Sequence, residues 1–144
     1  MDTIRTPALG RPEAKPLRPR VLIVDDESRI RLALRACLEA EDYDVEEAAD
    51  GMEAMEAVRL RRPRLIILDL SMPRMSGIEA LREMNLLYGP TMPSVIVLTA
   101  YGSPHGRDAA TKAGASAFLE KPLLPDVLRR IVDDVLHSST GVPS

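Results

Sequence analysis

The chain alternates short apolar runs with longer stretches in which apolar residues recur every three or four positions. Short runs rich in Val and Ile are typical of strands buried on both faces, and the longer spacing is typical of amphipathic helices. The predicted strands are 21–24, 45–48, 65–68, 95–98 and 117–119. The predicted helices are 28–41, a helix opened by Asp50-Gly51, 77–87, 107–112 and 126–136. This alternation predicts an α/β fold, a doubly wound parallel sheet with helices on both faces.

Polar side chains follow four of the predicted strands at the point where each strand ends. Asp25 and Asp26 follow the first strand, Asp69 the third, Thr99 the fourth and Lys121 the fifth. In doubly wound sheets, ligands bind outside the carboxyl ends of the strands. We therefore expect these five side chains to meet at one edge of the sheet.

Three carboxylates at one edge repel one another unless a cation lies between them. Mg²⁺ prefers oxygen ligands, and it commonly combines a few carboxylates with waters and a phosphate. An aspartate can also accept a phosphoryl group, with a lysine and a hydroxyl neutralising the charge. Taken singly, Asp25 and Asp26 could be a helix N-cap pair and Lys121 a surface lysine. Their coincidence at one edge favours a site that handles metal and phosphate.

Composition narrows the class of protein. The chain has 144 residues, 45% of them hydrophobic, a net charge of −3 and one cysteine. This composition predicts one globular domain and excludes intrinsic disorder, internal disulfides and a thiolate zinc site. No apolar run has the length of a membrane span and no signal peptide is recognisable, so we expect a cytoplasmic protein.

The two ends of the chain differ from its middle. We expect a flexible tail rich in Pro and Arg at 1–19, a globular domain at 20–137 and a frayed end at 138–144. Residues 1–20 carry four prolines and a charge of +3, which leaves −6 on the remainder. Proline at this density does not sustain a helix or a central strand. The tail is either an unstructured leader or a basic docking arm.

Four motifs together resemble the receiver domain of bacterial two-component response regulators. They are VLIVDDE (21–27), LIILDLSMPRMSGIE (65–79), VLTAY (97–101) and GASAFLEKP (114–122). The spacings also match that family, with 43 residues from Asp26 to Asp69, 30 to Thr99 and 22 to Lys121. The resemblance covers about 20–137, and it implies a flavodoxin-like (βα)5 sandwich with strand order 2-1-3-4-5.

The resemblance implies a role for each residue of the acidic edge. Asp69 matches the phosphoacceptor. Asp26 and Asp69 match direct Mg²⁺ ligands, together with the backbone carbonyl of Ser71, while Asp25 acts through water. Lys121 matches the lysine that contacts the phosphoryl oxygens.

Further positions match the family's switch and loop residues. Thr99 matches the hydroxyl that turns toward the phosphoryl group, and Phe118 matches the aromatic switch residue. Because Phe118 has no hydroxyl, we expect burial alone to hold its position. Pro73 and Gly77 match residues that shape the loop after the acceptor, and Pro122 matches a proline preceded by a cis bond.

Two other residues lie beside the expected phosphate. Ser71 and Tyr101 come two residues after Asp69 and Thr99. We hypothesise that they tune the lifetime of the aspartyl phosphate by controlling the attacking water.

The resemblance implies a phosphorylation-activated signalling switch. The protein would be a phosphoacceptor and not an enzyme, beyond its own phosphorylation and dephosphorylation, with Mg²⁺ as cofactor. Its partners would be a histidine kinase or a histidine phosphotransfer protein and a downstream protein target, with no direct contact to nucleic acid or membrane. Since only about eight residues follow Leu136, we expect no output domain, and the surface around Phe118 would act in trans. A diffusible effector and a relay intermediate remain open, as do a monomer and a phosphorylation-dependent dimer.

Three other classes fit less well. A phosphatase of the haloacid dehalogenase type needs Asp-x-Asp after a strand, whereas Asp69 is followed by Leu70-Ser71. A nucleotide-binding module needs a glycine-rich first turn, whereas this turn is acidic from Asp25 to Glu27. A degenerate receiver that serves as a scaffold would have lost an acidic ligand or Lys121, and none is lost.

Overall fold

The predicted strands pair into one parallel sheet in the order β2-β1-β3-β4-β5, as expected. The computed structural model describes residues 18–70, 76–99 and 107–138. The strands are β1 (Arg20–Val24), β2 (Asp44–Ala48), β3 (Leu65–Asp69), β4 (Ser94–Thr99) and β5 (Ala117–Glu120). Each runs one or two residues beyond its apolar run, because polar residues at the ends also join the hydrogen-bonded ladder.

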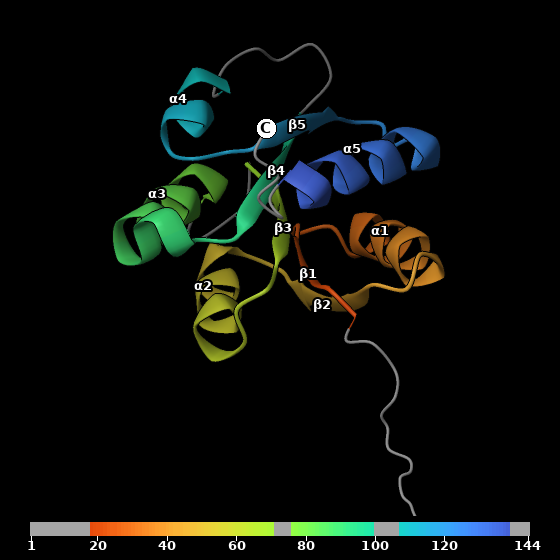
Figure 1. The fold of residues 1–144 in the computed structure, drawn as a ribbon, viewed down its shortest axis with the longest axis horizontal. Helices are drawn as coiled ribbons and strands as arrows, with labels where there is room; N and C mark the ends of the chain where they lie inside the picture. The colour runs from red at the N-terminus through yellow and green to blue at the C-terminus, as the bar shows by residue number, and fades with distance from the viewer. Residues whose placement is uncertain (1–17, 71–75, 100–106, 139–144) are drawn as a thin grey trace, which may run out of the picture.

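Helices cover both faces of the sheet (Figure 1). One face carries α1 (Ser28–Ala40) and α5 (Pro125–Ser138). The other carries α2 (Gly51–Leu60), α3 (Gly77–Tyr88) and α4 (Arg107–Lys112), with a short 3-10 turn, η1 (Gly89–Thr91), after α3. The helices agree with the predicted ranges, while η1 was not predicted. The doubly wound α/β fold is therefore confirmed.

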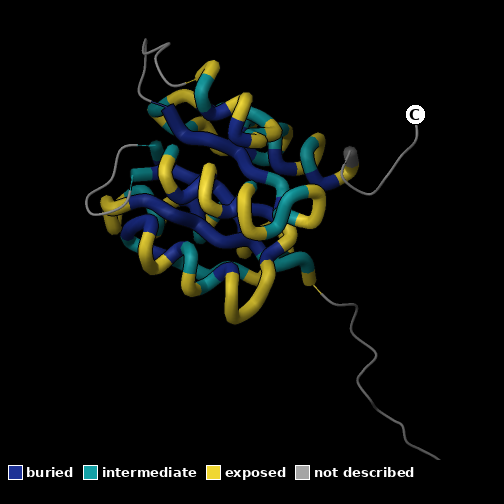
Figure 2. The backbone as a smooth tube through the Cα atoms, turned by 90° about the vertical axis from the view of Figure 1, so that its left-hand side faces the viewer, coloured by how far each residue is buried: buried dark blue, intermediate teal, exposed yellow. Residues whose placement is uncertain are grey.

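The core consists of two apolar layers, one on each side of the sheet. In Figure 2 the buried residues, in dark blue, run through the middle of the molecule. Alternate residues of β1 point to opposite layers, so Val21 and Ile23 pack under α1 and α5 while Leu22 and Val24 pack under α2 and α3. On α1, Leu34 and Leu38 are fully buried. Ile30 and Cys37 pack at the margin of that layer. No helix in the described ranges is long and apolar enough to span a bilayer.

Side-chain caps fix where two helices begin. Asp50 accepts a hydrogen bond from the Glu53 N–H at 2.9 Å and caps α2. The Ser76 hydroxyl accepts from the Glu79 N–H at 3.2 Å, and the Glu79 carboxylate accepts from the Ser76 N–H at 2.9 Å. This reciprocal pair is a capping box, which starts α3 at Gly77 and so orients the chain just after β3.

Candidate functional site

Three carboxylates meet at the carboxyl edge of the sheet. Asp25 and Asp26 follow β1, and Asp69 is the last residue of the adjacent β3. One oxygen from each of the three lies within 4.8 Å of the others. The sheet order therefore brings together residues that are more than 40 positions apart, as the strand-end pattern predicts.

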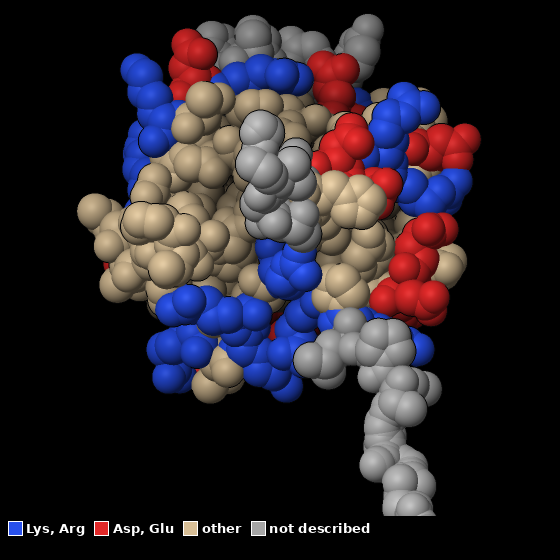
Figure 3. Space-filling model, in the orientation of Figure 1, with Lys and Arg blue, Asp and Glu red and all other residues tan. Residues whose placement is uncertain are grey.

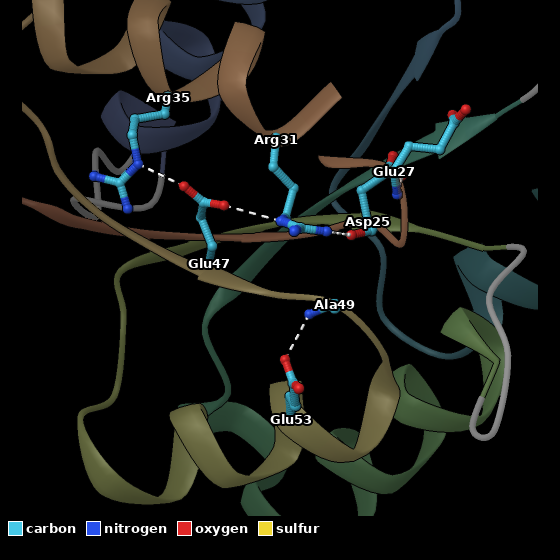
Figure 4. Close-up of polar contacts among 7 residues, drawn as sticks. All are labelled: Asp25, Glu27, Arg31, Arg35, Glu47, Ala49 and Glu53. Atoms are coloured by element: carbon cyan, nitrogen blue, oxygen red, sulfur yellow. Dashed lines mark hydrogen bonds and ion pairs between the residues drawn. The ribbon is translucent and has the colours of Figure 1, made fainter. Parts of the chain in front are cut away.

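Asp25 is the most deeply placed of the three. Its side chain is fully buried, while Asp26 is exposed. Oδ1 of Asp25 accepts the Glu27 N–H at 2.9 Å, and its backbone carbonyl accepts from the Arg31 guanidinium at 2.7 Å (Figure 4). Oδ2 faces the Lys121 ammonium, 3.3 Å away. Burial raises the pKa of Asp25, while the Glu27 N–H and the Lys121 ammonium work in the opposite direction.

Lys121 supplies the positive charge of the site. Its backbone N–H donates to the Thr99 carbonyl at 2.9 Å, so the end of β5 is tied to the end of β4. The ammonium lies 3.3 Å from Asp25 Oδ2 and 3.7 Å from Asp69 Oδ2. Burial disfavours the charged ammonium, but Asp69 and Asp25 outweigh it and hold the pKa of Lys121 above its usual range. Lys121 is therefore protonated at neutral pH.

Thr99 brings a hydroxyl to the same edge. It is the last residue of β4, and it is only 5% exposed. Its Oγ1 has no hydrogen-bond partner among residues 18–70, 76–99 and 107–138. A buried hydroxyl without a partner is costly, and such groups mark positions where a ligand oxygen can complete the bonding.

Gly77 lies against the backbone of the strand that carries Asp69. Its N–H donates to the Leu70 carbonyl at 3.0 Å. A Cβ at this position would lie 2.2 Å from the Asp69 carbonyl oxygen and 2.6 Å from the Leu70 Cα. Only glycine allows this approach, so the structure gives a steric reason for Gly77 in the loop motif.

Phe118 lies on β5, three residues before Lys121, and its ring is half-buried. The Arg107 guanidinium of α4 covers the ring at 4.8 Å from its centroid. The expectation that burial alone holds Phe118 is therefore incomplete, because a cation–π contact also restrains it. Arg107, Phe118, Val127 and Ile131 line one hollow of about 370 Å³.

Of the remaining predicted residues, the structure describes Pro122 but not the other three. The Lys121-Pro122 bond is cis, which confirms that expectation. Ser71, Pro73 and Tyr101 lie outside the described residues.

Sequence reasoning missed two residues around the site. Glu27 approaches the Lys121 ammonium at 3.9 Å, and Arg31 holds the backbone of Asp25. Glu27 directly follows the acidic pair in the sequence, which is a weak signal. Arg31 carries no local signal, because its partners come from other elements. Arg107 was expected on the same face as Phe118, but its cation–π contact with the ring was not.

The carboxylate set fits a hard divalent cation. The three aspartates offer only oxygen ligands, and one oxygen from each lies within 4.8 Å of the others. The residues present therefore fit a hard metal ion of the kind that prefers oxygen ligands.

Comparison with known proteins agrees with this geometry. The family model of the response regulator receiver domain matches residues 21–133. The chain belongs to the response regulator receiver family. Curated relatives include Response regulator MprA of Mycobacterium leprae, which is 42% identical over 78% of this chain and 49% of its own length. The chain thus spans about half the length of the curated relatives it matches.

Solved structures of receiver proteins share the fold over most of this chain. Chemotaxis protein CheY4 of Vibrio cholerae has a TM-score of 0.77 and 32% identity over 83% of this chain and 99% of its own. The receiver domain of a LuxO repressor protein of Vibrio parahaemolyticus has a TM-score of 0.79 and 36% identity over 86% and 94%. The chain is therefore a regulatory domain of two-component signalling.

Proposed function

We propose that this receiver domain is a phosphorylation-controlled switch with Asp69 as the phosphoacceptor. The observation that carries the proposal is the grouping of Asp25, Asp26 and Asp69 within 4.8 Å, with the Lys121 ammonium 3.7 Å from Asp69. The phosphoryl donor is the phosphohistidine of a histidine kinase or of a histidine phosphotransfer protein. The family assignment supports this proposal. The acidic edge supports it as well, because a metal ion held there and the Lys121 ammonium would neutralise the charge of a phosphoryl group.

The transfer exchanges one phosphorus bond for another. A carboxylate oxygen of Asp69 bonds to phosphorus, and the bond from phosphorus to the donor's histidine nitrogen breaks. The nitrogen keeps the electron pair and takes up a proton. Asp25, Asp26 and Asp69 would hold Mg²⁺, which neutralises phosphoryl oxygens when it is bound.

Two side chains complete the neutralisation of the phosphoryl group. The Lys121 ammonium, now held by carboxylates, gains phosphoryl oxygens as partners. The Thr99 hydroxyl, which has no hydrogen-bond partner among the described residues, donates to another phosphoryl oxygen. Ser71 and Tyr101 are proposed to tune how fast water removes the phosphoryl group.

The output is proposed to be the surface around Phe118. Movement of Thr99 toward the phosphate frees space for the ring, and the hollow lined by Arg107, Val127 and Ile131 changes shape. A downstream protein reads that change in trans. The domain acts either as a diffusible effector of that protein or as a relay intermediate that passes the phosphoryl group on.

Intact-mass spectrometry tests the phosphoacceptor. The protein is incubated with acetyl phosphate, with Mg²⁺ or with a chelator, alongside the Asp69→Asn variant. We expect a gain of one phosphoryl group in the wild type with Mg²⁺, and none with the chelator or in the variant. Calorimetric titration with Mg²⁺ runs in parallel. Absence of both phosphorylation and Mg²⁺ binding contradicts the proposal.

A further inference from the structure

Six arginines gather at the end of the sheet opposite the carboxylate site. This arginine patch consists of Arg18, Arg20, Arg59, Arg61, Arg62 and Arg64. The Arg64 N–H donates to the Arg20 carbonyl at 2.9 Å, which joins the amino ends of β1 and β3. Arg18 lies two residues before β1, and Arg59, Arg61 and Arg62 lie at the end of α2 and in the turn after it. Figure 3 shows Lys and Arg side chains gathered around α2 at the lower left of the molecule.

Half of the patch is neutralised by neighbouring carboxylates. Three ion pairs do this, Arg20–Asp44 at 3.1 Å, Arg59–Glu56 at 2.6 Å and Arg61–Glu46 at 2.5 Å. Arg18, Arg62 and Arg64 have no carboxylate partner in the part of the chain that the structure describes, and all three are exposed. The patch thus has three positive charges in excess on a chain whose net charge is −3.

One of the unpaired arginines is held in place, and an apolar side chain stands beside it. The Arg62 guanidinium stacks on the Tyr88 ring at 4.1 Å from its centroid, which orients it at small entropic cost. Leu60, two residues earlier, is 59% exposed. A planar guanidinium fork matches a carboxylate in two-point hydrogen bonding better than an ammonium does.

We propose that the arginine patch docks a short acidic segment of a partner protein, with an apolar residue of that segment against Leu60. Asp44, Glu46 and Glu56 already occupy three of the six guanidinium groups, so the patch lacks the continuous row of free cations that matches the closely spaced phosphates of a nucleic acid or an anionic bilayer. A segment with a few separated carboxylates can instead reach Arg18, Arg62 and Arg64 and avoid them. Charge complementarity therefore selects a protein segment.

The patch is separate from the phosphorylation site. Strand β1 has five residues, so the Cα atoms at its two ends lie roughly 13 Å apart at about 3.3 Å per residue. A segment on the patch leaves Asp69 and the hollow at Phe118 open. The surface is thus suited to holding a partner in both states of the switch.

Fluorescence anisotropy tests the proposal with a labelled peptide of ten residues, glutamates around a central leucine. The triple variant Arg18→Gln, Arg62→Gln, Arg64→Gln is compared with the matched triple Arg29→Gln, Arg82→Gln, Arg130→Gln. The control removes the same charge from exposed positions on α1, α3 and α5. We expect about tenfold weaker binding in the patch variant and a change within about twofold in the control.

Further measurements distinguish docking of an acidic segment from binding by net charge alone and from binding of lipid or DNA. Replacing the peptide's leucine by serine should weaken binding to the wild type and leave binding to Leu60→Ser unchanged. Equal losses in the two triple variants overturn the proposal, because net charge alone then explains binding. Tighter binding of phosphatidylserine vesicles or duplex DNA than of the peptide also overturns it. Phosphorylation by acetyl phosphate and thermal unfolding, measured on every variant, show that fold and Asp69 chemistry are intact.

Discussion

At the scale of the residue, the environment of Asp25 favours the neutral form of its carboxyl group over the ionised form. It is fully buried, and burial raises its pKa above 3.8 despite the Glu27 N–H and Lys121. Because the folded state holds the proton more tightly than the unfolded state, this group favours folding only at low pH. Its ionisation lowers the free energy of unfolding as the pH rises through the raised pKa. A bound cation would stabilise the ionised carboxylate, which agrees with the proposed role of Asp25 as a metal ligand.

The Asp25→Asn substitution should therefore stabilise the metal-free protein at neutral pH. Asp26→Asn is the matched control, and it should give little change because Asp26 is exposed. Denaturant unfolding with a chelator measures both. Adding Mg²⁺ should raise the unfolding midpoint of the wild type and shift that of Asp25→Asn much less. A destabilised Asp25→Asn protein would show that the ion pair with Lys121 outweighs the burial cost.

At the scale of the element, Gly77 allows the start of α3 to pack directly against the backbone at the end of β3. A Cβ there meets the Asp69 carbonyl oxygen at 2.2 Å, so Gly77→Ala forces the strand end to move. We expect a loss of about 2 kcal/mol in unfolding free energy, although alanine favours a helix by about 1 kcal/mol over glycine. Phosphorylation by acetyl phosphate should slow at least about tenfold, because the acceptor shifts with its backbone.

Gly89→Ala is the matched control for this substitution. Gly89 has φ +51°, and a Cβ there meets no atom within 4 Å. Alanine at this position costs about 1–3 kcal/mol through its backbone alone, because φ 51° with ψ −128° is rarely adopted by residues with a Cβ, and it should leave phosphorylation unchanged. Equal phosphorylation rates in the two variants would contradict the steric role of Gly77.

Glu47 joins α1 to the edge strand β2. Its carboxylate accepts from Arg35 at 2.6 Å and from Arg31 at 2.9 Å (Figure 4). The Arg35 guanidinium lowers the pKa of Glu47, burial opposes this shift, and Arg31 adds to it. Stability from this group is present above pH 4.5 and is lost as the pH falls through the lowered pKa.

The Glu47→Gln substitution should remove the pH dependence of the unfolding free energy that comes from this carboxylate. We expect a loss below about 1 kcal/mol at neutral pH, because the pair is partly exposed and screened. The difference in unfolding free energy between wild type and variant should shrink on acidification. Urea unfolding at several pH values measures it, and a constant difference would rule out the ion pairs as its source.

At the scale of the whole molecule, the proposed switch requires a change to pass from β4 to the surface of β5 and α4. Thr99 and Phe118 lie on adjacent strands, since Thr99 pairs with Glu120 and Val97 pairs with Phe118. Thr99→Val keeps the shape and removes a buried hydroxyl that has no partner within the described ranges. The variant should fold with unchanged or slightly greater stability, still accept phosphate at Asp69, and lose the response at Phe118.

Fluorine NMR can follow this coupling, because Phe118 is the only phenylalanine in the chain. Labelling with fluorophenylalanine therefore gives one resonance from the folded protein. We expect phosphorylation to shift it in the wild type and to shift it far less in Thr99→Val. A full shift in the variant would show that the ring responds without the hydroxyl.

The fold was largely predictable because each element leaves a local signal. The Val and Ile runs predicted β1, β3 and β4 to within a residue or two, since buried parallel strands are apolar on both faces. Polar end residues such as Asp44, Ser94 and Glu120 carried no such signal, and only backbone pairing with a neighbour places them in strands. The carboxylate edge was predictable because strand ends meet in a parallel sheet.

The sequence by itself determined the α/β class, the strand ends that carry Asp25, Asp69, Thr99 and Lys121, and the family resemblance that assigns their roles. Local periodicity reports that a side chain is buried, but it does not report what packs against it. Tertiary packing alone decided that Asp25 is buried while Asp26 is exposed, and that Gly77 touches the Asp69 backbone. It also decided that Arg107 covers Phe118 and that six arginines from β1, α2 and their flanks share one surface. These contacts join residues of different elements, so they arise only when the elements assemble.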